Sequence, residues 1–227
     1  MRHVDPKSFL ELEGPARWYG VYPAKVTSVK DPDSQGRIQV QLLATPDEGG
    51  DSFKVWARVA TLMAGPSRGS FFIPDPDDEV LVAFFAGDPR RPYVVGALWN
   101  GQDAPPASMD GDGKNNLRVI TSRAGHKLEF DDTDGSAKIT LTTPNGNKLT
   151  LDDGATKVTL EGSAGAKIEF DSSGGITITA PSGLTVQTPQ MTVNAPIATF
   201  SGVTKHSTVI STTVVGSTYT PGAGNLW

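Results

Sequence analysis

Hydrophobic and polar side chains alternate strictly in a short phrase that recurs through the second half of the chain. Its full copies are His126–Asp132, Asn147–Asp153 and Ala166–Ser172. Shorter copies at 138–141 and 157–160 lie between them, so a unit begins about every ten residues, a fixed period typical of arrays. A period of two is the pattern of a half-buried strand, and Asp-Gly and Asn-Gly steps form the turns between units. The pattern therefore predicts a meander of short β-strands.

One face of this predicted array is apolar, and a single unit has nothing to cover it. Each unit offers two core side chains, worth roughly 3–6 kcal/mol if fully buried. Ordering about ten residues costs roughly 10–20 kcal/mol of backbone entropy. The apolar face must therefore pack against another copy of itself or another sheet, which favours a fibre-like oligomer. The expected core side chains are Leu128, Phe130, Ile139, Leu141, Leu149, Leu151, Val158, Leu160, Ile168, Phe170, Ile176, Ile178, Leu184 and Val186.

The repeat shortens beyond Gly174. The phrases that start at Ile176, Leu184 and Met191 lie about seven or eight residues apart, and their outward positions become Thr, Gln or Asn. This change predicts that the meander gives way to a narrower, more tightly wound β-prism.

The region 21–98 has the pattern of five strands separated by loops rich in Gly, Pro and Asp. The expected strands are Tyr22–Lys30, Arg37–Leu43, Phe53–Leu62, Glu79–Phe85 and Tyr93–Leu98. Five strands in about eighty residues, with no helix between them, favour a small closed barrel of the OB type over a sandwich. The fourth strand is apolar on both faces, because Val80, Val82 and Phe84 alternate with Leu81, Ala83 and Phe85. One face is expected to fill the barrel while the other meets a neighbouring subunit or hub protein.

Two segments flank this barrel. Lys7–Gly14 has the pattern of one short helix that ends at a glycine, and it is read either as a docking arm or as a frayed terminus. Gly101–Asn116 is rich in Gly, Pro, Asp and Asn and is therefore predicted to be a linker.

A long motif at 77–101, DDEVLVAFFAGDPRRPYVVGALWNG, resembles the OB-fold domain of the phage baseplate assembly protein V and VgrG spike family. Gly36–Leu42 and Val55–Ala60 are similar to the earlier strands of that family. One departure is Asp77, where relatives usually have Gly, and it affects turn geometry rather than function. The resemblance is close only over the barrel, because the repeat array is similar to the family in character alone.

The resemblance implies an all-β chain with an N-terminal OB-fold barrel and a C-terminal repetitive β-array, a trimeric β-helix or β-prism. The implied domains are an N-terminal arm at 1–20, the OB fold at 21–100, a linker at 101–116 and a needle with its tip at 117–227. In that family the OB domain sits beneath a hub protein, and the needle projects along a threefold axis. Sheath contraction drives the needle through a target envelope, so the implied function is a structural, membrane-puncturing central spike.

The chain end carries the candidate for a tip partner. Pro221–Gly224 cannot continue a strand array, and Asn225, Leu226 and Trp227 follow it. On a threefold axis three such ends would form one small apolar platform. Because relatives without a metal-sharpened tip commonly carry a separate PAAR-type cone, the resemblance implies that these three residues dock a tip protein.

Composition and charge restrict the partners and the cellular location that the sequence predicts. The net charge is −5 and no long basic run occurs, so binding to nucleic acid is not favoured. The chain has no cysteine, which excludes disulfides and thiolate metal sites. No stretch approaches the ~20 apolar residues of a membrane helix, and the start lacks the apolar core of a signal peptide. We therefore expect synthesis in the cytoplasm without signal-directed export, and incorporation into a phage tail or contractile injection particle.

Catalytic and metal-binding motifs are expected to be absent. Gly65–Gly69 matches the G-x-S-x-G nucleophile elbow, but a proline precedes the serine and no helix follows. Asp31–Gly36 imitates a calcium loop, but its twelfth position is Leu42 where Glu is required, so a hairpin turn is expected. His206 has no second histidine two residues away, so the six-imidazole iron site of the family is not expected. In some relatives an enzymatic domain follows the OB fold, whereas only the linker follows it here. No enzyme, cofactor or metal is therefore predicted.

The alternative from another functional class is an OB module that binds oligosaccharide or single-stranded nucleic acid and is displayed on a β-stalk. Nucleic acid would require a basic groove interleaved with aromatic side chains. The acidic balance of the chain and the acidic loop Pro74–Glu79 argue against that groove.

Overall fold

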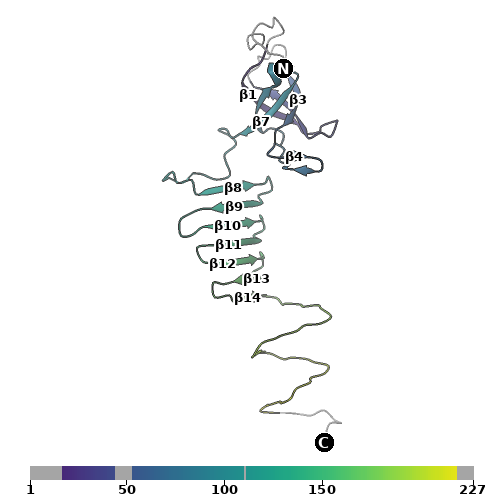
Figure 1. Cartoon of the computed structure of the whole chain (residues 1–227), viewed down its shortest axis with the longest axis vertical. Coiled ribbons are helices and arrows are strands. Elements are labelled where there is room, and N and C mark those ends of the chain that lie inside the picture. The colour runs from purple at the N-terminus through teal and green to yellow at the C-terminus, as the bar shows by residue number, and fades with distance from the viewer. Residues whose placement is uncertain (1–16, 44–52, 110, 219–227) are drawn as a thin grey trace, which may run out of the picture. The chain divides into compact units, whose positions relative to one another are not determined.

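The computed structural model describes residues 17–43, 53–109 and 111–218. Within them the fold is all-β apart from one 3-10 turn at Phe85–Gly87. The chain divides into two compact units, 1–179 and 180–227, and the first contains a closed barrel and a separate seven-stranded sheet (Figure 1). The predicted all-β class and the order of barrel and repetitive sheet are confirmed. No helix in this described part is long and apolar enough to span a bilayer.

The barrel contains the five strands expected from the sequence, with ends displaced by a few residues. They are β1 (Val21–Ser28), β2 (Arg37–Leu42), β3 (Lys54–Val59), β6 (Glu79–Phe84) and β7 (Pro92–Leu98). Their order around the barrel is β1-β2-β3-β7-β6. Neighbours are antiparallel except β3 and β7, whose parallel pairing closes the barrel.

Alternating side chains of these strands fill the barrel. Every second residue of β2 and β6 is buried, as a strand with one face on a core requires. Val80 and Val82 are fully buried and Phe84 is nearly so, so these three residues form the inner face of β6. The complete core is Ala24, Val26, Ile38, Val40, Leu42, Ala57, Val80, Val82, Phe84 and Val94.

The turn at Asp88–Arg91 is held by local contacts of its two arginines. The Arg90 guanidinium donates to the Asp88 carboxylate at 3.0 Å and holds the pKa of Asp88 down to about 2. The Arg91 N–H donates to the Asp88 carbonyl at 2.9 Å, and its guanidinium lies 5.7 Å from the Phe85 ring centre. Both arginines therefore stabilise the turn in which they lie.

Asp77 adopts a backbone conformation that normally favours glycine. Its φ is 80°, and its N–H donates to the Val26 carbonyl at 2.9 Å. Its carboxylate lies 2.8 Å from Lys25 Nζ. The departure noted in the sequence therefore falls at a left-handed turn position, where the ion pair offsets part of the conformational cost.

A short hairpin that the sequence did not predict lies between β3 and β6. Its strands β4 (Ala64–Gly65) and β5 (Arg68–Gly69) pair only with each other. Ser67 turns between them with a φ of 54°. Gly69 has a φ of 145°, and a Cβ there would collide with the Met63 carbonyl oxygen. The G-x-S-x-G pattern is therefore a hairpin turn in this fold.

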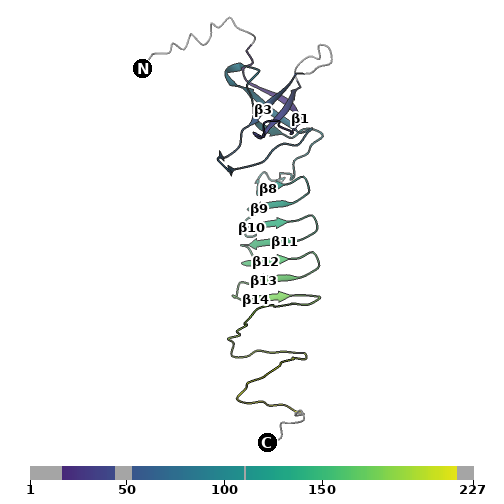
Figure 2. The ribbon, with the colours of Figure 1, turned by 90° about the vertical axis from the view of Figure 1, so that its right-hand side faces the viewer.

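The seven-stranded sheet confirms the predicted meander. Its strands are β8 (Leu117–Thr121), β9 (Lys127–Asp131), β10 (Lys138–Thr142), β11 (Lys148–Asp152), β12 (Lys157–Glu161), β13 (Lys167–Phe170) and β14 (Ile176–Thr179). Each pairs antiparallel with the next, and the strands stack like rungs (Figure 2). Gly125, Gly146 and Gly165 all have positive φ and donate to the residue three before them at 2.8–2.9 Å. The same turn therefore closes every second connection.

The second unit has a different character over its described residues 180–218. It contains no strand or helix there, only extended stretches separated by bends (Figure 1). The strands expected at 184–187 and 191–194 are therefore not formed within the single chain. Its side-chain hydrogen bonds are local ones, such as Thr188 Oγ1 to the Gln190 carbonyl at 2.8 Å and Ser211 Oγ to the Thr213 carbonyl at 2.8 Å.

Candidate assembly interface

The register of the seven-stranded sheet places its large apolar side chains in two columns on one face. The first column is Ile120, Leu128, Leu141, Leu149, Leu160, Ile168 and Ile178. The second is Phe130, Ile139, Leu151, Val158, Phe170 and Ile176. Each member lies directly opposite the next on the adjacent strand, so both columns are continuous ladders of apolar pairs.

Nothing in the described chain covers this apolar face. Most column members, including Leu141, Leu160 and Ile178, are about half exposed (48%, 51% and 55%). On the opposite, polar face Thr140 is only 9% exposed, because neighbouring long side chains shield it. A sheet whose polar face is better covered than its apolar face has the surface of an interface and not of a free monomer.

Twelve of the fourteen predicted core residues are brought together in these columns. Leu184 and Val186 lie in the second unit, where both are exposed and neither belongs to a strand. Ile120 extends the first column and was missed, although the alternation in Leu117–Thr121 carries the same signal. The predicted tip residues Asn225, Leu226 and Trp227 lie outside the described residues, as does the short helix predicted at 7–14.

The second unit also exposes its apolar side chains. They include Met191, Val193, Ile197, Phe200, Val203, Val209, Ile210, Val214 and Val215, all more than half exposed. No inter-strand ladder pairs the backbone of residues 180–218 within the chain. Extended backbone with free N–H and C=O groups is a template for pairing with another chain.

Ion pairs organise the polar face of the sheet. Lys167 and Lys157 lie 3.0 and 3.4 Å from the Glu169 carboxylate, and their hydrogen bonds lower the pKa of Glu169. Lys138 lies 3.4 Å from Asp131. The pKa of Asp131 is lowered mainly by the hydroxyl and N–H of Thr133 and further by Lys138. These contacts fix the register of strands within one chain.

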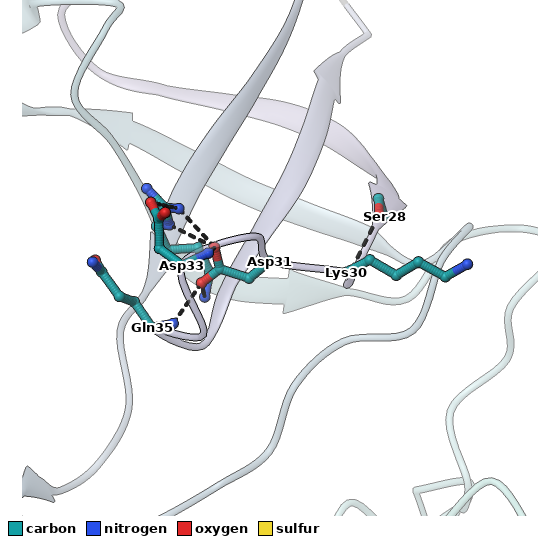
Figure 3. A network of polar contacts seen from close by, with 6 residues as sticks. Ser28, Lys30, Asp31, Asp33 and Gln35 are labelled. Atoms are coloured by element: carbon teal, nitrogen blue, oxygen red, sulfur yellow. Dashed lines mark hydrogen bonds and ion pairs between the residues drawn. The ribbon is translucent and has the colours of Figure 1, made fainter.

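The loop that imitates a calcium site is a closed hairpin turn (Figure 3). The Asp31 carboxylate accepts N–H donors of Asp33, Gln35 and Arg37 at 2.7–3.1 Å, and the Arg37 guanidinium donates to it at 2.6 and 3.1 Å. The Arg37 side chain and these N–H groups hold the pKa of Asp31 far below its usual value. The protein's own donors occupy the oxygens that a cation would need. Across the described ranges, no three His, Asp or Glu side chains gather as a metal site.

The outer face of the barrel bears on the alternative reading. OB folds bind oligonucleotides and oligosaccharides on the face of their second and third strands. Here Arg37 lies over the Trp56 ring at 5.8 Å and Arg58 over the Tyr93 ring at 5.6 Å. Each of these two rings therefore has an arginine of its own chain over one of its faces.

Two domain families match the chain. Residues 22–99 match the injector OB domain of type VI secretion systems and phage baseplates. Residues 138–199 match the phage baseplate V C-terminal trimerisation domain. The second match covers most of the apolar columns and continues into the second unit, and it supports a homotrimer.

The relatives with curated descriptions include type VI secretion system spike proteins. VgrG1a of Pseudomonas aeruginosa is 28% identical over 102 residues, which is 44% of this chain and 16% of that protein. VgrG3 of Vibrio cholerae is 34% identical over 113 residues, 48% of this chain and 11% of that protein. VgrG4b of P. aeruginosa is 34% identical over 114 residues, 43% of this chain and 14% of that protein. The chain thus spans only a small part of their length. The chain therefore combines an injector OB domain with a phage baseplate V C-terminal trimerisation domain, and over less than half of its length it is similar to VgrG spike proteins.

Proposed function

We propose that this protein is the homotrimeric central spike of a contractile injection machine, either a phage tail baseplate or a related secretion system. The observation that carries the proposal is the uncovered apolar face of the sheet, within a region that matches a trimerisation domain. The role is mechanical: the needle joins the hub to the tip and is driven through a target envelope. No residue is assigned a catalytic role.

Three copies of the sheet would cover one another's apolar columns around a common axis. Ten of the thirteen Val, Leu, Ile and Phe side chains in the columns are between 37% and 62% exposed. Burying the exposed part of these ten would contribute roughly 8–15 kcal/mol per chain, as an upper estimate. Association costs roughly 4–15 kcal/mol in lost freedom. Burial of this face is therefore large enough to hold a trimer together.

The second unit would complete the same shaft in a different way. Because residues 180–218 have no ladder of their own, their extended backbone requires strands from other chains. Three chains wound about the axis would supply those strands and bury the exposed apolar side chains between them. Such a shaft has no free lateral edge, which suits a rigid needle.

The remaining partners follow from the resemblance to the spike family. The OB barrel would face a hub protein, and the three C-terminal ends, with Asn225, Leu226 and Trp227, would receive a small PAAR-type tip protein. Deleting Gly224–Trp227 tests the tip. We expect the deleted protein to remain a trimer and to lose capture of a purified tip protein, whereas loss of the trimer or unchanged capture would contradict a docking role.

The proposed location is the baseplate end of the assembled particle, reached after synthesis in the cytoplasm. Antibody labelling of purified contractile particles should mark the baseplate end, and particles from cells that lack the protein should not assemble a complete baseplate. Normal particles without the protein would contradict the proposal.

A filter-binding assay with single-stranded DNA and glycans tests the OB-module alternative, and we expect no retention above that of a bovine albumin control.

A further inference from the structure

Most rungs of the seven-stranded sheet carry opposite charges at their two ends. β9 runs from Lys127 to Asp131, β11 from Lys148 to Asp152, and β12 from Lys157 to Glu161. β13 starts at Lys167 and is followed directly by Asp171. The exceptions are β8, β14 and β10, the last of which runs from Lys138 to Thr142. The first and fifth residues of a strand share one face, so these charges lie on the polar face at its two lateral sides.

The turns add unpaired charge to the two sides. One side, here called the aspartate side, contains the turns 132–137, 153–156 and 171–175, with Asp134 and Asp153, and with Asp132, which pairs with Arg118 of its own chain. The other, the lysine side, contains the turns 122–126, 143–147 and 162–166 and begins β11 at Lys148. Within the described residues, Asp134, Asp153 and Lys148 make no ion pair. Each side therefore retains charges that its own chain does not neutralise.

Cyclic symmetry brings these two sides together. In a ring of three copies every contact is heterologous, so the aspartate side of one protomer meets the lysine side of the next. If the three apolar faces surround an axis that runs along the stack of rungs, a threefold rotation does not shift any rung along that axis. The end of each strand then lies at the level of the start of the same strand in the next protomer.

We propose that the seams between protomers are charge-complementary rung by rung, with Lys148 of one protomer facing Asp152 and Asp153 of the next. The same rotation sets Lys127 against Asp131 and Asp132, Lys167 against Asp171, and Glu161 against Lys157. This inference rests on the proposed trimer and adds the surfaces by which the sheets recognise one another laterally. It also fixes their relative height, because a slip of one rung would set Lys148 of one protomer against Lys138 or Lys157 of the next.

Ion pairs within one sheet explain the position of some charged residues, but not of Lys148 and Asp153. Lys138 sits between Asp131 and Asp152 on adjacent strands and pairs with Asp131. Lys148 and Asp153, in contrast, lie five residues apart along one extended strand, roughly 16 Å at about 3.3 Å per residue. They cannot contact each other within a chain, so any direct link between them must join two chains.

Cysteine pairs test the seam without background, because the chain has no cysteine. The double variant Lys148→Cys/Asp153→Cys is treated with a short bis-maleimide and run on a denaturing gel, and its mass before treatment is measured by light scattering. We expect bands of two and three linked chains. The single variants Lys148→Cys and Asp153→Cys should stay at one chain, since like residues lie at different seams. Lys127→Cys/Asp132→Cys should repeat the result at the β9 rung.

The outcomes separate the seam from the proposed function. A trimer in solution whose double variants give only single chains on the gel would overturn the seam and leave the spike proposal standing. Linked chains in a single-cysteine variant would also overturn it, because they would place like residues together. If both double variants are monomers while the unmodified protein is a trimer, the substituted side chains are needed for assembly, which supports the seam. A monomeric unmodified protein would contradict the proposed function itself.

Discussion

Ile139 and Leu151 lie directly opposite each other on neighbouring strands, yet each keeps about two-fifths of its surface exposed. The same pair type in the barrel, Val80 beside Ala24, is fully buried. Both pairs arise from the same alternation of apolar and polar residues. The difference is that the barrel closes on itself, whereas the sheet has one layer that no other described part of the chain covers.

Replacing Leu149 by Asp should prevent assembly. Leu149 lies in the first apolar column between Leu141 and Leu160. In a trimer three carboxylates would be buried around the axis, each at a cost of several kcal/mol. We expect a monomer at micromolar concentration in size-exclusion chromatography.

Thr142→Asp is the matched control for this variant. Thr142 lies on the polar face between Lys127 and Lys148. The variant therefore adds the same negative charge at a position between two lysines. We expect it to remain a trimer. Intact trimers from Leu149→Asp, or dissociation of both variants, would show that the apolar columns do not form the interface.

Hydrogen exchange should reveal strand pairing in the second unit. Residues 184–187 and 191–194 have no ladder within the chain, so their amides would exchange at the rate of an unfolded peptide in a monomer. In the trimer we expect them to be protected at least as long as the amides of β11. Fast exchange of these amides in a sample of confirmed trimeric mass would contradict strand pairing between the three chains in the second unit.

Acid should weaken the barrel in part through Asp31. Its folded-state pKa is depressed by Arg37 and by backbone N–H donors, so its contribution is complete above the unfolded pKa of about 3.9. The contribution is lost as the pH falls below that value towards the folded pKa. Asp31→Asn removes the charge at every pH. We therefore expect the variant to be less stable than the wild type at pH 7, with a smaller further loss on acidification.

Urea unfolding of the barrel at pH 7 and pH 3, followed by tryptophan fluorescence, measures this difference. Asp88 is unchanged in both proteins, so its own titration cancels in the comparison. An equal loss of stability in wild type and variant would show that the Asp31–Arg37 contact does not stabilise the fold.

Shortening a side chain in the barrel core should lower the stability of the barrel without changing the oligomeric mass. Ile38 is fully buried, so Ile38→Ala should cost roughly 2–5 kcal/mol and Ile38→Val roughly 0.5–1.5 kcal/mol. We expect the barrel transition in urea to shift accordingly while the oligomeric mass stays the same. A change of oligomeric mass in Ile38→Val would indicate that the barrel core is coupled to assembly.

Strict alternation made much of this fold predictable. In segments such as Lys127–Asp131 and Arg37–Leu42 the period of two identifies both the strand and its apolar face. The hairpin at 64–69 was missed because two-residue strands are too short to show a period. It forms through the positive φ of Ser67 and the close approach of Gly69 to Met63, which no hydropathy pattern encodes.

The candidate interface was predictable in part for the same reason. Leu149 and Leu151 alternate with polar residues, so the face that carries them follows from the sequence. Leu184 and Val186 show the same alternation, yet they form no strand in the single chain. Hydropathy indicates which side chains need burial, but it does not indicate whether the hydrogen-bonding strand comes from the same chain. Charge complementarity between sides became visible only once the register placed both ends of each rung.

The mass of the protein in solution tests the central claim most directly. Light scattering coupled to size-exclusion chromatography, at micromolar concentration and physiological salt, reports mass independently of shape. The account predicts three times the chain mass of 23.9 kDa. A single species of 23.9 kDa would contradict it, because the two apolar columns would then be stable while exposed to water.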